Sequence, residues 1–215
     1  ALMLLLSQLT MSGMSSYVYP NYYGSAAAQS LASLVGMAGT LLICAPTAVK
    51  LSQKLGKKEL ATAGAIVGAV AYLLCFLLRP SNPFVYVAFA AVATVSMGYF
   101  NTVVWAMITD VIDDTEVRTG VREDGTVYSV YSFARKLGQA ISSGLIGALL
   151  TMIGYSEATA FDPAVTGKIF NLSCLAPFAG FVALALILVF LYPLNKTRVE
   201  QNVATLAARR EGKEN

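Results

Sequence analysis

Six long apolar stretches, separated by short polar or proline-containing segments, dominate the pattern of hydrophobic and polar positions along the chain. A helix that crosses a bilayer needs about 20 mostly apolar residues. None of the stretches has the broad charged face of an outer helix in a soluble protein, which disfavours long buried helices of a soluble fold. The pattern therefore predicts six membrane-spanning helices at residues 1–19, 27–49, 60–78, 84–108, 126–153 and 169–192.

The composition supports this interpretation. Of the 215 residues, 56% are hydrophobic and 13% are charged, whereas about a quarter of the residues of a soluble domain are charged. No long polar block is present that would form a separate soluble domain. We therefore expect an all-α integral membrane protein, with a six-helix bundle at residues 1–193 and a cytoplasmic tail at residues 194–215.

The first apolar stretch begins abruptly. The chain opens with ALMLLLSQLT and has no initiator Met, no basic segment and no small-residue cleavage site, so this stretch is not a signal peptide by those criteria. It resembles a helix entered partway along. We expect further residues upstream, which makes the first helix of the bundle a truncated one.

Basic residues gather in alternate connections between the spans. The poorer connections hold only Arg79 and Lys168. Because loops rich in Lys and Arg stay in the cytoplasm, the richer side is predicted to be cytoplasmic, together with both termini. The basic residues on that side are Lys50, Lys54, Lys57, Lys58, Arg118, Arg122, Lys196, Arg198, Arg209, Arg210 and Lys213.

Few side chains are suited to catalysis. Cys44, Cys75 and Cys174 lie inside apolar runs without metal-ligand spacing, so we interpret them as small buried residues. The chain has no histidine, which excludes His-based catalytic triads. Asp113 and Asp114 are adjacent and would point about 100° apart on a helix. We therefore expect neither an enzyme nor a metal site.

The fifth predicted span carries a polar stripe. At 100° per residue its polar side chains fall on one side and its apolar ones on the other. Since a charge in hydrocarbon costs at least about 2.5 kcal/mol, this stripe is expected to face protein or a water-filled cavity. Alternatively, Arg135 and Lys136 extend to the headgroups. Both lie about 15 Å into the span, which favours a solute pathway. The predicted pathway residues are Tyr128, Tyr131, Ser132, Lys136 and Gln139.

The fourth predicted span has a weaker stripe, which includes Asn101 and Trp105. An amide can hydrogen-bond sugar hydroxyls, and an indole can stack on the apolar face of a sugar ring. Ordinary hydrogen bonding between helices is an equally good interpretation of this stripe. Glycines also recur inside the spans, and we interpret Gly64, Gly68, Gly138, Gly144 and Gly147 as sites of close helix packing.

The connection between these two spans, DVIDDTEVRTGVRED at residues 110–124, alternates acidic and basic residues. A solvated charged loop is the default interpretation. The alternative is a set of ion pairs with a neighbouring bundle that holds a gate shut in one conformation and breaks in the other. The candidate gate residues are Asp110, Asp113, Arg118 and Arg122.

Six spans with both ends on one side suit half of a major facilitator transporter. The segments WAMITDVIDD (105–114) and RTGVREDGTVYSVYSFARKLGQAISS (118–143) resemble the glycoside–pentoside–hexuronide:cation symporter family, which includes melibiose and glucuronide permeases. KLGKK after Pro46 and the late YPLNK also resemble family segments. The resemblance implies a fold made of helices seven to twelve of a major facilitator protein.

The resemblance also implies roles for individual residues. Lys136 matches a lysine near the sugar and the coupling cation, and Tyr131 and Ser132 match neighbouring cavity positions. Trp105 lies in a segment shared with glucuronide-type members. The four candidate gate residues match a charged network that closes the cytoplasmic side.

The implied function is sugar symport with Na⁺ or H⁺ by alternating access in the bacterial inner membrane. The family's cation-binding aspartates lie in an amino-terminal half that this sequence does not contain, and an ammonium group such as Lys136 does not bind Na⁺. The expected partners are the bilayer, a sugar or uronide, and the missing half or a second copy. No nucleic acid and no cofactor beyond the coupling ion are expected. The alternative is a natural half-size or non-transporting subunit that acts only as a dimer or with a partner half.

Overall fold

The computed structural model describes residues 2–214, with side chains described as far as Glu211, and no strand occurs among these residues. The first residue of the predicted first span and the last residue of the predicted tail lie outside this range. The elements are α1 (Leu2–Tyr17), η1 (Val18–Tyr22), α2 (Ala26–Gly39), η2 (Thr40–Cys44), α3 (Ala45–Leu55), α4 (Lys57–Leu78), α5 (Pro83–Thr119), α6 (Asp124–Met152), α7 (Pro163–Leu186), η3 (Ile187–Leu191) and α8 (Lys196–Glu214).

Each predicted span coincides with a helix or with a continuous run of helices. In the part of the chain that the structure describes, four runs are long and apolar enough to cross a membrane: Ala26–Leu55, Lys57–Leu78, Pro83–Thr119 and Pro163–Leu191. Helix α1 has 16 residues. Helix α6 has 29 residues and is long enough to cross a membrane. It is not among those four runs because its polar stripe makes it less apolar.

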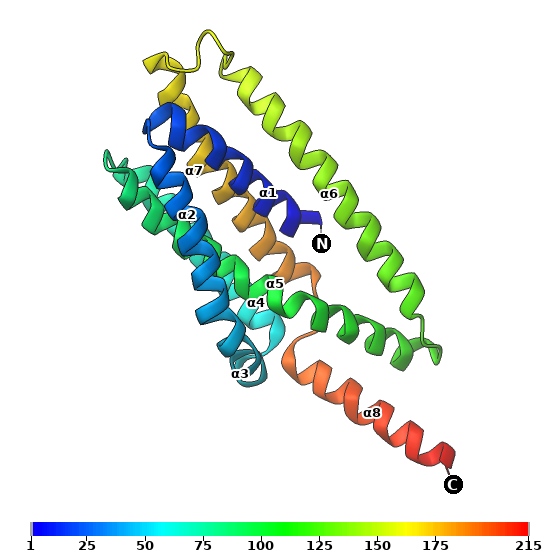
Figure 1. Ribbon diagram of the computed structural model, residues 1–215. Helices are drawn as coiled ribbons and strands as arrows, with labels where there is room; N and C mark the ends of the chain where they lie inside the picture. Colours follow the sequence, from blue (N-terminus) through cyan, green and yellow to red (C-terminus); the bar gives the residue numbers. More distant parts are fainter. Residues whose placement is uncertain (1, 215) are drawn as a thin grey trace.

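The helices form a bundle in which α4 packs against both α5 and α7, while α2 packs against α5. Helix α1 lies between α7 and α6 (Figure 1). Helix α6 runs along the outside of the bundle and rests mainly on α1, with a smaller contact to α5 near the connection between them. One long side of α6 is therefore open in this bundle.

Small residues bring α4 close to its neighbours, as the spacing of Gly64 and Gly68 predicts. A Cβ atom added to Gly64 would lie 2.7 Å from the backbone carbonyl oxygen of Ser96 on α5. One added to Gly68 would lie 2.6 Å from the ring of Phe181 on α7. The cysteines Cys44, Cys75 and Cys174 are all buried, which confirms that prediction.

The glycines of α6 differ from the expectation. Gly138 approaches the backbone of α1, where an added Cβ atom would lie 3.1 Å from the carbonyl oxygen of Leu2. Gly144 and Gly147 have no atom within 4 Å of such a Cβ position. Within this bundle, close packing therefore explains only the first of the three.

Helix α5 is longer than predicted, because the acidic segment after residue 108 continues the helix to Thr119. An ion pair within the helix compensates part of the acidic charge of this segment, because Arg118 pairs with Asp114 one turn earlier at 3.2 Å. The helix ends at Gly120, whose φ of 77° is a left-handed conformation that glycine adopts without strain. The predicted charged loop is thereby reduced to a few residues before α6.

The tail also has regular structure, since α8 is a helix that projects beyond the bundle (Figure 1). It packs against the charged end of α5. Arg209 donates hydrogen bonds to the carbonyl oxygens of Glu116 and Val117, at 3.3 and 3.0 Å. These are carbonyls of the last turn of α5, where a cation is favourable.

We expect Gly64→Ala to destabilise the protein, because the added methyl group meets backbone and not a flexible side chain. The cost should be about 1–3 kcal/mol, which is typical of overpacking. Thermal unfolding of the full-length protein in detergent measures it. Gly167→Ala in α7 is the matched control, because nothing lies within 4 Å of its Cβ position. Equal unfolding temperatures for the two variants would contradict the close α4–α5 contact.

Candidate functional site: a polar cleft and a charged helix end

A cleft of about 310 Å³ lies where α1, α5 and α6 meet, a volume within the usual range of small-molecule sites. Its polar side chains come from all three helices. The amide of Asn101 on α5 donates a hydrogen bond to Gln8 on α1, at 3.3 Å. Gln139 on α6 lines the same cleft. The cleft therefore offers amide donors and acceptors inside a largely apolar bundle.

Aromatic rings and one cation form another wall of the cleft. Trp105 and Tyr131 meet edge to face, with ring centroids 5.4 Å apart. The guanidinium carbon of Arg135 lies 5.6 Å from the Trp105 ring centroid and 5.7 Å from that of Tyr131. Both distances are in the range of a cation–π interaction. Among the described residues, Arg135 forms no ion pair with a carboxylate.

The structure brings together four of the seven predicted substrate-binding residues. Asn101, Trp105, Tyr131 and Gln139 all line the cleft. The other three, Tyr128, Ser132 and Lys136, are exposed on α6 and do not line it.

Residues Gln8 and Arg135 line the cleft but were not among the predicted site residues. Gln8 is an isolated amide in an apolar run, and a polar residue in such a position is itself a signal. Arg135 belonged to the predicted stripe, but the family resemblance favoured its neighbour Lys136. Which of the two enters the cleft depends on the rotation of α6 against α1, and the stripe alone does not fix that rotation.

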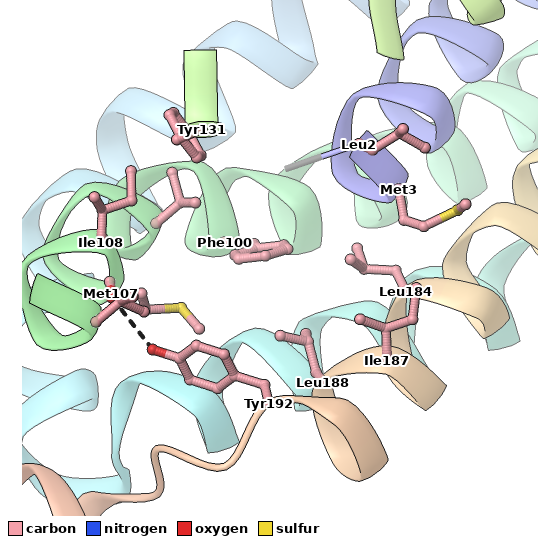
Figure 2. Close-up of a pocket in the computed structure, with 12 residues that line it drawn as sticks. Leu2, Met3, Phe100, Met107, Ile108, Tyr131, Leu184, Ile187, Leu188 and Tyr192 are labelled. Carbon is pink, nitrogen blue, oxygen red and sulfur yellow. Dashed lines mark hydrogen bonds between the residues drawn. The ribbon is translucent and has the colours of Figure 1, made fainter. Parts of the chain in front are cut away.

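An apolar cavity of about 480 Å³ adjoins the cleft and shares Val104 and Tyr131 with it. Figure 2 shows Leu2 and Met3 facing Leu184 across this space, with Tyr131 at its edge. The only hydrogen bond drawn there runs from the Tyr192 hydroxyl to the carbonyl oxygen of Met107, at 3.3 Å. Tyr131 thus stands between a polar space and an apolar one.

Three of the predicted gate residues lie at the end of α5 that faces α8, and Arg122 follows in the connection to α6. Asp110 is buried and forms a 2.6 Å ion pair with Lys57 at the start of α4. Arg122 binds Asp113 and Glu116 at 2.9 Å each, and Asp124 at 3.0 Å. Hydrogen bonds from Arg122 to Asp113 and then Glu116 raise its pKa above the usual value. The three carboxylates therefore favour the charged form that arginine already has at physiological pH.

Asp114, which was not among the predicted gate residues, connects α5 to α8. It is buried and accepts hydrogen bonds at 3.0 Å from both Arg198 and Asn202 on α8. Arg118, the fourth predicted gate residue, is exposed and pairs with the same carboxylate at 3.2 Å. In the described part of the chain, the partners of these acids lie on α4, α5 and α8 and in the connection after α5. Within residues 2–214, no group of three His, Cys, Asp or Glu side chains is placed to hold a metal ion.

We expect Asp114→Asn to loosen α8 and lower stability, because two arginines would lose their shared carboxylate. Hydrogen bonds to charged groups contribute about 1.5–3 kcal/mol each. Thermal unfolding and limited proteolysis between α7 and α8, both in the full-length protein, measure the effect. Glu200→Gln is the control, since that side chain is 66% exposed and its contact to Lys196 is 4.0 Å. An exposed pair contributes about 0–1 kcal/mol. Equal proteolysis of both variants would refute the role of Asp114.

Comparison with known proteins assigns the chain to a family. The family model described as "MFS/sugar transport protein" matches residues 1–196. The chain is 32% identical to the "Glucuronide carrier protein homolog" of Escherichia coli K12, over 78% of this chain and 36% of that protein. It is 36% identical to the "Putative sulfoquinovose importer" of the same organism, over 74% of this chain and 33% of that protein. It is 35% identical to the "Uncharacterized symporter YjmB" of Bacillus subtilis, over 73% of this chain and 34% of that protein.

The chain spans about a third of the length of these curated relatives. Its all-helical structure with four candidate spans is that of part of a major facilitator membrane fold. The matched region contains the polar cleft, the apolar cavity and the charged end of α5. The chain belongs to the MFS/sugar transport protein family, within the glycoside–pentoside–hexuronide:cation symporters of the major facilitator superfamily.

Proposed function

We propose that this chain forms one six-helix half of a secondary active transporter, and not an enzyme. It carries a sugar across the bacterial inner membrane together with Na⁺ or H⁺ by alternating access. The observation that carries this proposal is the cleft between α1, α5 and α6, with amide side chains beside an indole ring. Amides pair with ring hydroxyls, and the indole covers the apolar face of a sugar ring.

The solute that suits the cleft best is an acidic sugar. Arg135 lies in the cleft without a carboxylate partner among the described residues. A guanidinium group binds carboxylates and related anions through two parallel hydrogen bonds. The names of the first two relatives point to the same chemistry, since glucuronides carry a carboxylate and sulfoquinovose carries a sulfonate.

A second six-helix half completes the transporter in this proposal, either an amino-terminal half of the same polypeptide or a second copy. The open side of α6 supports it, because Tyr128, Ser132 and Lys136 are exposed there. Ionisable side chains on membrane helices normally face a bundle interior or a cavity. Lys136 would then lie at the interface of the halves, near a coupling-cation site supplied mainly by the other half.

The charged end of α5 lies on the cytoplasmic side in this proposal, together with both ends of the chain. The lysine-rich start of α4 and the basic residues of α8 support this orientation. The ion pairs of Asp110, Asp113, Arg118 and Arg122 hold that end closed in one conformation and separate in the other.

Trp105→Ala in the full-length protein should raise the KM for sugar uptake into proteoliposomes at least about tenfold, which corresponds to about 1.4 kcal/mol. The variant removes the ring that both Arg135 and Tyr131 contact. Phe133→Ala is the control, because its side chain is 69% exposed on the other side of α6. Unchanged uptake in Trp105→Ala, at equal protein content, would exclude the cleft as the sugar site.

Arg135→Gln should raise the KM for D-glucuronate by about 10- to 100-fold, as expected for a lost charged hydrogen bond. Uptake of D-glucose, which has no anionic group, should change much less. Lys136→Ala should instead abolish cation-coupled uptake while exchange of D-glucuronate across the membrane persists. If Arg135→Gln weakens both sugars equally, the guanidinium does not recognise the anionic group.

A further inference from the structure

A second polar space lies between α1 and α2, apart from the predicted pathway. This groove has a volume of about 300 Å³, and no charged residue lines it. Hydroxyl and amide side chains from several helices face it, together with several small or apolar residues. These polar residues are Gln8, Ser12, Ser15, Ser16, Tyr19, Gln29, Ser33, Tyr72 and Thr94.

The hydroxyl groups of the groove retain free acceptor capacity. Ser15 donates its proton to the carbonyl oxygen of Met11, at 2.9 Å, and Ser33 donates to that of Gln29, at 3.1 Å. Each hydroxyl oxygen still has lone pairs that accept hydrogen bonds. The groove is therefore suited to a ligand that brings its own hydroxyl donors.

Tyr19 gives independent evidence for a ligand. Its side chain is fully buried and lines the groove, yet its hydroxyl has no hydrogen-bond partner among the described residues. Its ring is fixed edge-to-face against Tyr86, with centroids 5.4 Å apart. Buried hydroxyl groups are almost always paired in native proteins. The hydroxyl oxygen is enclosed at the wall of the groove, so a ligand oxygen would become its partner once that wall opened slightly.

The groove adjoins the polar cleft at Gln8, which lines both spaces. From Gln8, the groove follows α1 to Tyr19, a distance of about 16 Å for eleven helical residues. Tyr19 belongs to η1, at the end of α1 away from the cleft. Polar side chains therefore recur along α1 from the cleft toward the connection between α1 and α2.

We infer that this groove is a second carbohydrate-binding site, a vestibule that holds the neutral hydroxyl groups of a sugar on its way to or from the cleft. The identity of the ligand as a sugar rests on the proposed function. Because no charged residue lines the groove, it has no side chain that would form an ion pair with a charged group of the ligand. Its serine and glutamine side chains do not suit a lipid tail. The groove thus offers partners for hydroxyl groups only, whereas the cleft has amides for hydroxyl groups and Arg135 for the anionic group.

Tyr19→Phe tests the site by removing a single oxygen. If the hydroxyl binds sugar, the KM for D-glucuronate uptake by the full-length protein should rise about 3- to 10-fold, the effect of one lost hydrogen bond. If the hydroxyl is simply an unpaired buried group, its removal should leave the KM unchanged and raise the unfolding temperature. Tyr23→Phe is the matched control, since that hydroxyl donates to the Pro80 carbonyl oxygen at 2.9 Å and does not line the groove.

Cysteine labelling tests the groove without relying on transport. Because Cys44, Cys75 and Cys174 are buried, the parent protein should react slowly with a water-soluble maleimide. The Ser33→Cys variant should react, and both D-glucuronate and D-glucose should slow the reaction. Glu157→Cys, at an exposed position outside the groove, should react equally with or without sugar.

The outcomes separate this inference from the proposed function. If Trp105→Ala impairs uptake while Tyr19→Phe has no effect and neither sugar slows labelling of the Ser33→Cys variant, the groove site is wrong and the proposed function stands. If the parent protein takes up neither sugar but both slow labelling of the Ser33→Cys variant, the proposed function is wrong and the groove site stands.

Discussion

A charged side chain at the centre of a bilayer costs at least about 2.5 kcal/mol, and an arginine on a helix of this bundle needs a polar or aromatic surrounding. Arg135 obtains it from Trp105 and Tyr131, whose rings it contacts on the side of α6 that faces α1 and α5. The apolar side of α6, which includes Val130 and Phe133, is left outside. The same requirement that keeps Arg135 away from lipid thereby creates the cleft.

Beyond the cleft, at the carboxyl end of α5, charged side chains are accommodated in a different way. There the acids are dense and each has a basic partner: Lys57 for Asp110, Arg122 for Asp113, Arg198 for Asp114. The pairs join α4, α5 and α8, so the charged end fixes helices relative to one another. The cleft, by contrast, has a cation without an acid among the described residues. Paired charges position the protein's own elements, whereas an unpaired charge is available to a solute.

The helices and the side of α6 that enters the bundle follow from periodicity, because apolar and polar positions separate cleanly on that helix. The choice between adjacent cations does not. Arg135 and Lys136 are about 100° apart, and the contact of Gly138 with the backbone of α1 sets which of them enters the cleft. The acidic segment after residue 108 has the composition of a loop, yet it is helical to Thr119. Arg118 pairs with Asp114 within the helix, and Lys57 and Arg198 bind Asp110 and Asp114 from other helices. Contacts distant in sequence, such as Asn101 with Gln8, lie beyond any local pattern.

Helix α1 connects the spaces that the other helices separate. Leu2 and Met3 line the apolar cavity, Gln8 lines both the cleft and the groove, and Tyr19 follows at the far end of the groove. Helix α1 also provides most of the support for α6. Because packed helices are not continuously deformable, a shift of α1 against α5 changes the apolar cavity, the cleft and the groove together. In the proposed function, a solute bound at Gln8 would therefore act on the helix that lines the apolar cavity, the cleft and the groove.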